Sequence, residues 1–268
     1  VRFTGESTKT SKMSTFGYDS SKTGFSLGTT FEQYEDIYIS PELSTYYETL
    51  STSDAASAAL QGQEGSYYDA EFRYSIIQDK RDRRFQPTEG YRASFNQKLP
   101  LYSESPSLLN GFNYSAYQGF GENIIGSVKF YGRTINALKS SEDVKRSERL
   151  SLPAKYLRGF EDGRVGPVDA EDHVGGNYVT ALSFNAGLPK LFPNLTNADV
   201  SIFLDTGNVW GVDYDSSIDD SNKIRSAFGV SVDWYTLVGP LSFSLSEDIT
   251  SAGTDKPESF RFNIGTTF

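Results

Sequence analysis

The last nine residues of the chain alternate between apolar side chains and polar or small ones, and they end on an aromatic residue. In a β-strand, successive side chains point to opposite faces, so one face of this segment is apolar. That face carries Phe260, Phe262, Ile264 and Phe268, and the other carries Arg261, Asn263, Gly265 and Thr267. The pattern is typical of a strand between lipid and water, and equally of an antiparallel sheet over a soluble core.

The composition favours membrane strands over membrane helices. Aromatic residues make up 14% of the chain, yet the mean hydropathy is -0.46, and apolar runs are only a few residues long. A membrane helix needs about 20 mostly apolar residues in a row. A transmembrane barrel alternates apolar with polar side chains and concentrates aromatic residues at the two interfaces, which gives this combination.

Strand-like alternation recurs along the whole chain between clusters of Gly, Asn, Asp, Ser and Pro, and no segment has a sustained helical period. The segments are long enough to cross a bilayer, which takes about 9–11 residues per strand. We therefore predict one all-β domain, an antiparallel transmembrane β-barrel with twelve strands in this chain. The predicted strands are 1–10, 23–33, 36–49, 67–80, 90–100, 111–121, 126–139, 177–188, 198–210, 223–236, 239–249 and 259–268.

The predicted connections alternate between short and long, as in an up-and-down membrane barrel. The short ones are 33–35, 83–89, 122–125, 189–197 and 237–238, and the long ones are 11–22, 50–66, 101–110, 140–176, 211–222 and 250–258. On this pattern the chain ends on the short-turn side, which faces the periplasm in the usual orientation. The 140–176 loop is too long for a simple connection and is the candidate functional segment.

Charge and residue types argue against several functions. A net charge of -10 argues against nucleic acid as a partner, because a phosphate-binding surface needs a basic stripe. The chain has no cysteine, so it has no disulfide, thiolate metal site or cysteine nucleophile. The acidic pairs Asp219-Asp220 and Glu247-Asp248 lack the ligand spacing of an EF loop, and we predict solvated tips with no metal or other cofactor.

His173, the only histidine, offers one catalytic alternative. A hydrolase would use it as a base for Ser147 or Ser151, with Asp172 as the third member. No nucleophile elbow or oxyanion motif accompanies these residues, so we do not expect an enzyme.

Four motifs follow one another between residue 79 and residue 210. They are Asp79–Gly90 (DKRDRRFQPTEG), Leu157–Phe160 (LRGF), Gly175–Asn177 (GGN) and Phe203–Trp210 (FLDTGNVW). Taken alone, Arg158-Gly159-Phe160 is typical of a solvated arginine beside a glycine in a turn. Four motifs in this order are a much more specific signature than any one of them.

With these motifs the chain resembles the BamA-like outer-membrane β-barrel assembly factors, whose relatives include TamA, two-partner secretion transporters and the mitochondrial sorting barrel. Residues 260–268 also resemble the β-signal of barrel clients. The resemblance implies an integral protein of the bacterial outer membrane with a lateral seam between weakly paired first and last strands. It implies three kinds of partner: unfolded outer-membrane β-barrel proteins, outer-membrane lipid with lipopolysaccharide, and accessory assembly lipoproteins.

The same resemblance assigns roles to individual residues. Leu157, Arg158, Gly159 and Phe160 form the loop motif that enters the lumen. Arg158 would pin the loop, because a guanidinium offers five donors in a rigid fork, and Asp205 is its expected inward-facing partner. Ala181 and Ser183 stand where relatives often carry a glutamate, and Asp233 is a conjectural substitute. Phe260, Phe262, Ile264, Gly265 and Phe268 would form the seam strand, which Gly265 would weaken.

The family barrel has sixteen strands, so residues 1–268 are expected to form the carboxyl-terminal part of a barrel domain without POTRA domains. No signal peptide opens the chain, which reads as a fragment or a processed product. Closure as a smaller barrel and pairing with another chain are the alternatives. The functional alternatives are a protein-secretion barrel, a passive porin and a soluble β-sandwich or lectin-like binding module.

Overall fold

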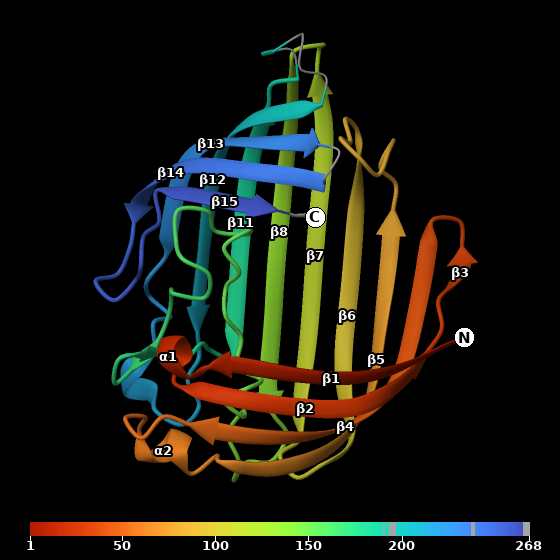
Figure 1. Ribbon diagram of the computed structural model, residues 1–268. Helices are drawn as coiled ribbons and strands as arrows, with labels where there is room; N and C mark the ends of the chain where they lie inside the picture. Colours follow the sequence, from red (N-terminus) through yellow and green to blue (C-terminus); the bar gives the residue numbers. More distant parts are fainter. Residues whose placement is uncertain (190, 193–196, 237–238, 265–268) are drawn as a thin grey trace.

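A computed structural model describes residues 1–189, 191–192, 197–236 and 239–264. The described strands form one antiparallel sheet in the order β1-β2-β4-β5-β6-β7-β8-β11-β12-β13-β14-β15, with β3 beside β4 and a separate β9–β10 pair (Figure 1). The strands are β1 (Arg2–Lys12), β2 (Tyr18–Gly28), β3 (Phe31–Tyr34), β4 (Ile37–Thr52), β5 (Gly65–Asp79), β6 (Gly90–Ser103), β7 (Ser107–Phe120), β8 (Ile124–Ala137), β9 (Val168–Asp169), β10 (Asp172–His173), β11 (Tyr178–Gly187), β12 (Ala198–Trp210), β13 (Arg225–Thr236), β14 (Gly239–Thr250) and β15 (Phe260–Ile264). The short helices are α1 (Met13–Phe16), α2 (Ala58–Gln61) and the 3-10 turn η1 (Ser216–Ile218).

The predicted all-β antiparallel architecture is confirmed. Each of the twelve predicted strands overlaps one strand of the main sheet order, and the predicted strand 23–33 runs on into the short strand β3. In the described part of the chain no helix has the length and apolar character needed to cross a membrane. Gly265 and Phe268, assigned to the terminal strand, lie outside the described residues.

Two of the connections predicted to be long are short, so the strict alternation of loop lengths was wrong. Strands β1 and β2 are joined by α1 and Gly17, and β6 and β7 by residues 104–106. The joined ends of β1 and β2 are polar, so there the apolar alternation stops before the strands do. Pro100 was read as the end of a strand, but it pairs with Glu71 at a register shift, where a residue without a backbone donor is tolerated.

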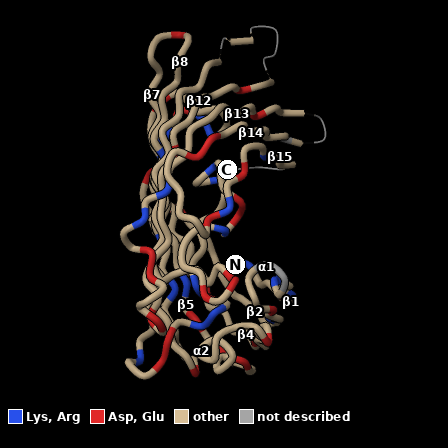
Figure 2. Tube along the Cα trace, turned by 90° about the vertical axis from the view of Figure 1, so that its left-hand side faces the viewer, with Lys and Arg blue, Asp and Glu red and all other residues tan. Residues whose placement is uncertain are grey.

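The sheet is strongly curved. The central strands form a wall, and both ends of the sheet curve away from it to the same side (Figures 1 and 2). The concave side is the lumen face. The segment 138–177, which we call the lumen loop, lies on it (Figure 1). In the described residues β1 and β15 each pair with one neighbour only, so they are the two edges of the sheet.

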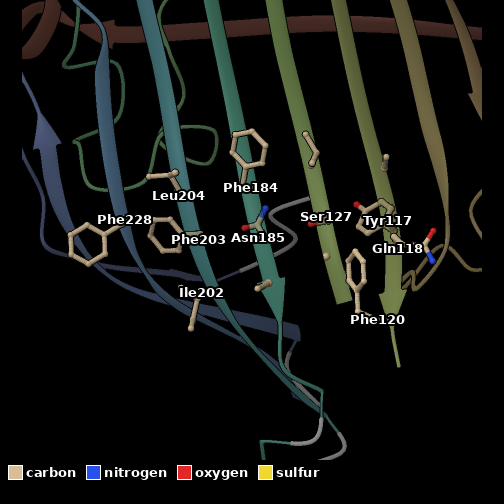
Figure 3. A pocket seen from close by; sticks show the side chains of 14 residues that line it. Tyr117, Gln118, Phe120, Ser127, Phe184, Asn185, Ile202, Phe203, Leu204 and Phe228 are labelled. Atoms are coloured by element: carbon tan, nitrogen blue, oxygen red, sulfur yellow. The ribbon is translucent and has the colours of Figure 1, made fainter. Parts of the chain in front are cut away.

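The convex face is apolar over many strands. Phe184 of β11 and Ile202 and Leu204 of β12 are exposed there (Figure 3), as are Phe228 and Val230 of β13. A shallow hollow on this face is lined by small residues between large rings, including Ala116, Phe120, Gly126 and Ala186. So broad an exposed apolar band suits lipid, as the alternation of side chains predicted.

Candidate functional site

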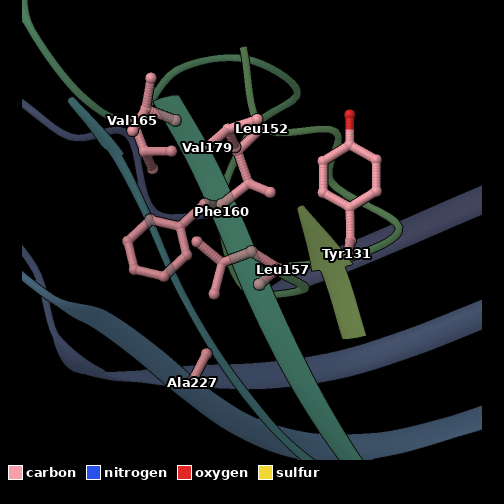
Figure 4. Packing of buried hydrophobic residues seen from close by; sticks show 9 residues of the cluster. Tyr131, Leu152, Leu157, Phe160, Val165, Val179 and Ala227 are labelled. Atoms are coloured by element: carbon pink, nitrogen blue, oxygen red, sulfur yellow. The ribbon is translucent and has the colours of Figure 1, made fainter. Parts of the chain in front are cut away.

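The lumen loop is held on the wall by a compact apolar core. Leu152, Leu157, Phe160 and Val165 are almost fully buried. They pack against inward-facing side chains of four strands, namely Tyr131, Val179, Ala181, Val209 and Ala227 (Figure 4). Successive residues of a β-strand point to opposite faces of the sheet. On each strand, the wall residues therefore lie on the same face as the polar side chains that point into the lumen.

Arg158 extends from this core to Asp205 on β12. Its Nε lies 2.7 Å from Oδ2 and its Nη2 lies 2.8 Å from Oδ1, while the main-chain N–H of Arg158 donates to Oδ2 at 3.0 Å. The Asp205 side chain is fully buried, and the Arg158 side chain is 17% exposed. A forked guanidinium on a buried carboxylate is a charge-assisted pair with a fixed geometry, which suits a loop anchor.

Neutral residues complete the shell around the guanidinium. Nη2 of Arg158 also donates to Asn185 Oδ1 at 2.8 Å and to Ser183 Oγ at 3.1 Å. Ser183 donates in turn to Asp205 Oδ1 at 2.6 Å, and the ring of Phe203 lies 3.5 Å below the guanidinium carbon. The structure therefore places Ser183 and Asn185 where a second carboxylate was sought.

Asp233 was a conjectural substitute for that carboxylate. In the described residues it accepts a hydrogen bond from Ser242 on the neighbouring strand β14 and none from Arg158. Asn185 and Ser231, whose Oγ lies 3.4 Å from Nη1 of Arg158, were missed. Strand parity places both on the lumen face, but parity does not say which loop residue they meet.

Position 159 requires glycine for two reasons, its backbone conformation and the lack of room for a side chain. Its φ is +94°, which L side chains rarely adopt, and a Cβ built on it would lie 2.6 Å from Cβ of Ala227. This close approach lets the loop lie flat against β13, with Leu157 and Phe160 directed into the core on either side.

Beyond Gly159 the loop pairs with the connection between β14 and β15. Glu258 N donates to the Gly159 carbonyl at 2.9 Å, and Phe160 and Pro257 form an isolated β-bridge. Arg261, in β15, donates to the Phe160 carbonyl at 3.1 Å and forms an ion pair with Glu258. The loop motif is thus bonded to the wall and to the last described strand.

The first part of the lumen loop is anchored at the other end of the sheet. Lys145 is buried between Asp69 at 2.8 Å and Glu48 at 3.4 Å, on β5 and β4. Burial alone would raise the pKa of Glu148, but Lys98 and Lys145 beside it lower that pKa to about 2. Basic and acidic residues accordingly lie close together near β4 and β5 (Figure 2). The loop therefore joins both halves of the curved sheet.

In the described part of the chain, neither the residues predicted for the seam nor His173 forms a hydrogen bond with Arg158. Phe260, Phe262 and Ile264 point to the exposed outer face, and Phe262 stacks on Phe243 of β14 at 4.9 Å between ring centroids. His173 is buried in β10. Among the described residues no hydrogen bond joins its ring to Ser147 or Ser151, so the hydrolase alternative gains no support.

A match to a protein-family model shows which family the chain belongs to. The Omp85 superfamily domain matches residues 1–268. This chain belongs to the Omp85 superfamily. The chain is also 27% identical, over an alignment of 143 residues, to the outer membrane protein assembly factor BamA of Neisseria meningitidis serogroup B (strain ATCC BAA-335 / MC58). That match covers 42% of this chain and 17% of the relative.

Two solved structures share the Omp85 fold. One is BamA from Haemophilus ducreyi lacking POTRA domains 1-3, with a TM-score of 0.83 at 20% identity, over 96% of this chain and 56% of that one. The other is CdiB from Acinetobacter baumannii, with a TM-score of 0.60 at 12% identity, over 92% of this chain and 42% of that one. The chain thus spans well under two thirds of these relatives. The resemblance to BamA-like barrels is confirmed, and the chain is an integral barrel of the bacterial outer membrane.

Proposed function

We propose that this Omp85 domain folds and inserts β-barrel proteins into the outer membrane through a lateral seam at β15. The observation that carries the proposal is the double attachment of the lumen loop. Arg158 bonds to Asp205 on the wall. The Gly159 carbonyl accepts from Glu258 in the connection before β15, and the Phe160 carbonyl accepts from Arg261 in β15. The loop thereby holds the edge strand in place while its free side stays available.

The chemistry of an edge strand supports this role. An edge presents unpaired N–H and C=O groups, which readily template another strand. In hydrocarbon such groups are costly, so an incoming strand that pairs with them is strongly favoured. In the described residues β15 pairs with β14, from Leu241↔Ile264 to Leu245↔Phe260, and with no strand on its other side. No covalent step is needed, and no catalytic group is assigned.

The proposed partners follow from the same function. They are unfolded outer-membrane β-barrel proteins at the edge strand, outer-membrane lipid and lipopolysaccharide against the convex apolar face, and accessory assembly lipoproteins. We propose that the chain end faces the periplasm, and that residues 1–268 are the carboxyl-terminal part of a larger barrel domain. The assembly role of the Neisseria relative, given in its name, supports these assignments.

Depletion of the full-length protein in cells tests the proposal. Folded outer-membrane barrels of unrelated sequence are counted by their heat-modifiable migration on gels. We expect them to fall while their unfolded forms accumulate. Normal insertion of all of them after depletion would reject the proposal.

Protein secretion is the competing function, and the shared fold of CdiB is the observation that favours it. The same depletion separates the two functions. A secretion barrel would leave unrelated barrels in place and would stop the export of one soluble partner.

A further inference from the structure

The turn between β5 and β6, residues 80–89, reaches across the lumen face to two distant strands. Nε2 of Gln86 donates to both carboxylate oxygens of Asp199 on β12, at 2.8 and 2.9 Å, across 113 residues of sequence. The ring of Phe85 meets the ring of Tyr235 on β13 edge to face, with 6.2 Å between centroids. Figure 1 shows this turn at the same end of the sheet as the tip of β13.

Internal hydrogen bonds and a glycine at its neck hold the turn rigid. The Asp82 carboxylate accepts from Thr88 N at 2.9 Å, from Thr88 Oγ1 at 2.8 Å and from Glu89 N at 3.2 Å. Arg81 donates to both oxygens of Asp79 at 2.8 Å. A Cβ on Gly90, whose φ is +88°, would lie 2.0 Å from the Lys80 carbonyl oxygen, so the neck of the turn admits only glycine. These bonds fix the shape of the turn independently of its contact with β12.

Gln86 itself is held in an unfavourable backbone conformation, with a φ of +48°. Non-glycine residues in this region carry strain, which persists only where the surroundings enforce it. Here the strained conformation directs the amide at Asp199. Such strain is common at clamps and switches, which marks the contact as a specific one.

The turn also forms one side of a cavity beneath Arg158. This cavity of about 160 Å³ is lined by Arg81, Arg84 and Gln86 on the turn and by Arg158 and Ser231 on the opposite side. The turn and Arg158 therefore line one cavity on the lumen face.

We propose that residues 80–89 form a bar across the lumen, latched by Gln86 to Asp199, that restricts the passage of ions and small solutes. This role is independent of the assembly function, because it concerns permeability and not the seam. Since the bar is rigid, the latch and the Phe85–Tyr235 contact determine whether it stays across the lumen.

Conductance of the full-length protein in planar lipid bilayers tests the bar. Gln86→Ala together with Phe85→Ala should raise the single-channel conductance several-fold over the unaltered protein. Gln118→Ala is the matched control, since Gln118 hydrogen bonds only to the carbonyl of the adjacent Gly119 in the described residues. Unchanged conductance in the double variant would overturn the proposal.

A reversible crosslink keeps the test independent of variant folding. This chain contains no cysteine, so Gln86→Cys with Asp199→Cys adds a unique pair. A short crosslinker that joins the two thiols through disulfide bonds should return the conductance of this pair to the unaltered level, and reduction of those disulfides should raise it again. Equal conductance before and after reduction would show that the latch does not limit passage.

Discussion

Arg158 binds Asp205 through three donors at once, two on its guanidinium and one on its own main chain. The side chain and the backbone of one loop residue are thereby fixed to one buried carboxylate. This explains how a single arginine holds a long loop on the wall. It also means that substitution of the side chain leaves one of the three bonds in place.

The contributions of Arg158 and Asp205 to the free energy of unfolding should therefore be strongly coupled. Arg158→Ala leaves the fully buried Asp205 carboxylate with too few donors, and breaking a buried pair costs about 3–5 kcal/mol. Asp205→Ala should have a similar effect. The double variant should lose much less stability than the sum of the single losses, as measured by urea denaturation of the detergent-solubilised protein. Additive losses would argue against pairing.

Gly159→Ala should loosen the lumen loop more than a glycine substitution elsewhere. A left-handed backbone costs a non-glycine residue about 1–2 kcal/mol, and here the methyl group also meets Ala227. Gly121→Ala is the matched control, because Gly121 also has a positive φ but has open space around it. Protease cleavage within the loop should rise in the first variant only. Equal cleavage in both would contradict the contact with Ala227.

Arg261→Ala should separate the lumen loop from β15 without disturbing the core. The variant loses the bond to the Phe160 carbonyl and the ion pair with Glu258. Hydrogen exchange at Glu161 and Glu258, whose N–H groups bridge the two segments, should accelerate, while exchange in β12 stays slow. Arg2→Ala, at the opposite edge strand, serves as control. Unchanged exchange at both residues would show that Arg261 does not join loop and strand.

Acidification should destabilise the loop through His173. Burial and the nearby charge of Arg164 lower the pKa of His173 from 6.5 to about 4. The unfolded chain therefore takes up a proton more readily than the folded one. The contribution of the buried, neutral His173 to the free energy of unfolding is fully present above pH 6.5 and is lost as the pH falls toward 4. The urea midpoint should drop over this window less in His173→Gln than in the unaltered protein, and equal drops would exclude His173 as the cause.

Sequence reasoning identified the strands because alternation is a local signal. It identified the Arg158–Asp205 pair through the family resemblance of the motifs, together with the parity that directs Asp205 inward. Strand ends were less predictable, since Pro100 looks like a terminator and is accommodated at a register shift. The contacts of Asn185 with Arg158 and of Gln86 with Asp199 depend on the curvature of the whole sheet, which no local pattern encodes.

Reconstitution of client folding tests the proposed assembly function. Full-length protein in liposomes is mixed with a urea-unfolded client barrel, and the folded client is followed by its heat-modifiable migration. We expect faster client folding than in empty liposomes, and a clear loss of that acceleration with Arg158→Ala. Client folding at the same rate with and without the protein would contradict the proposed function.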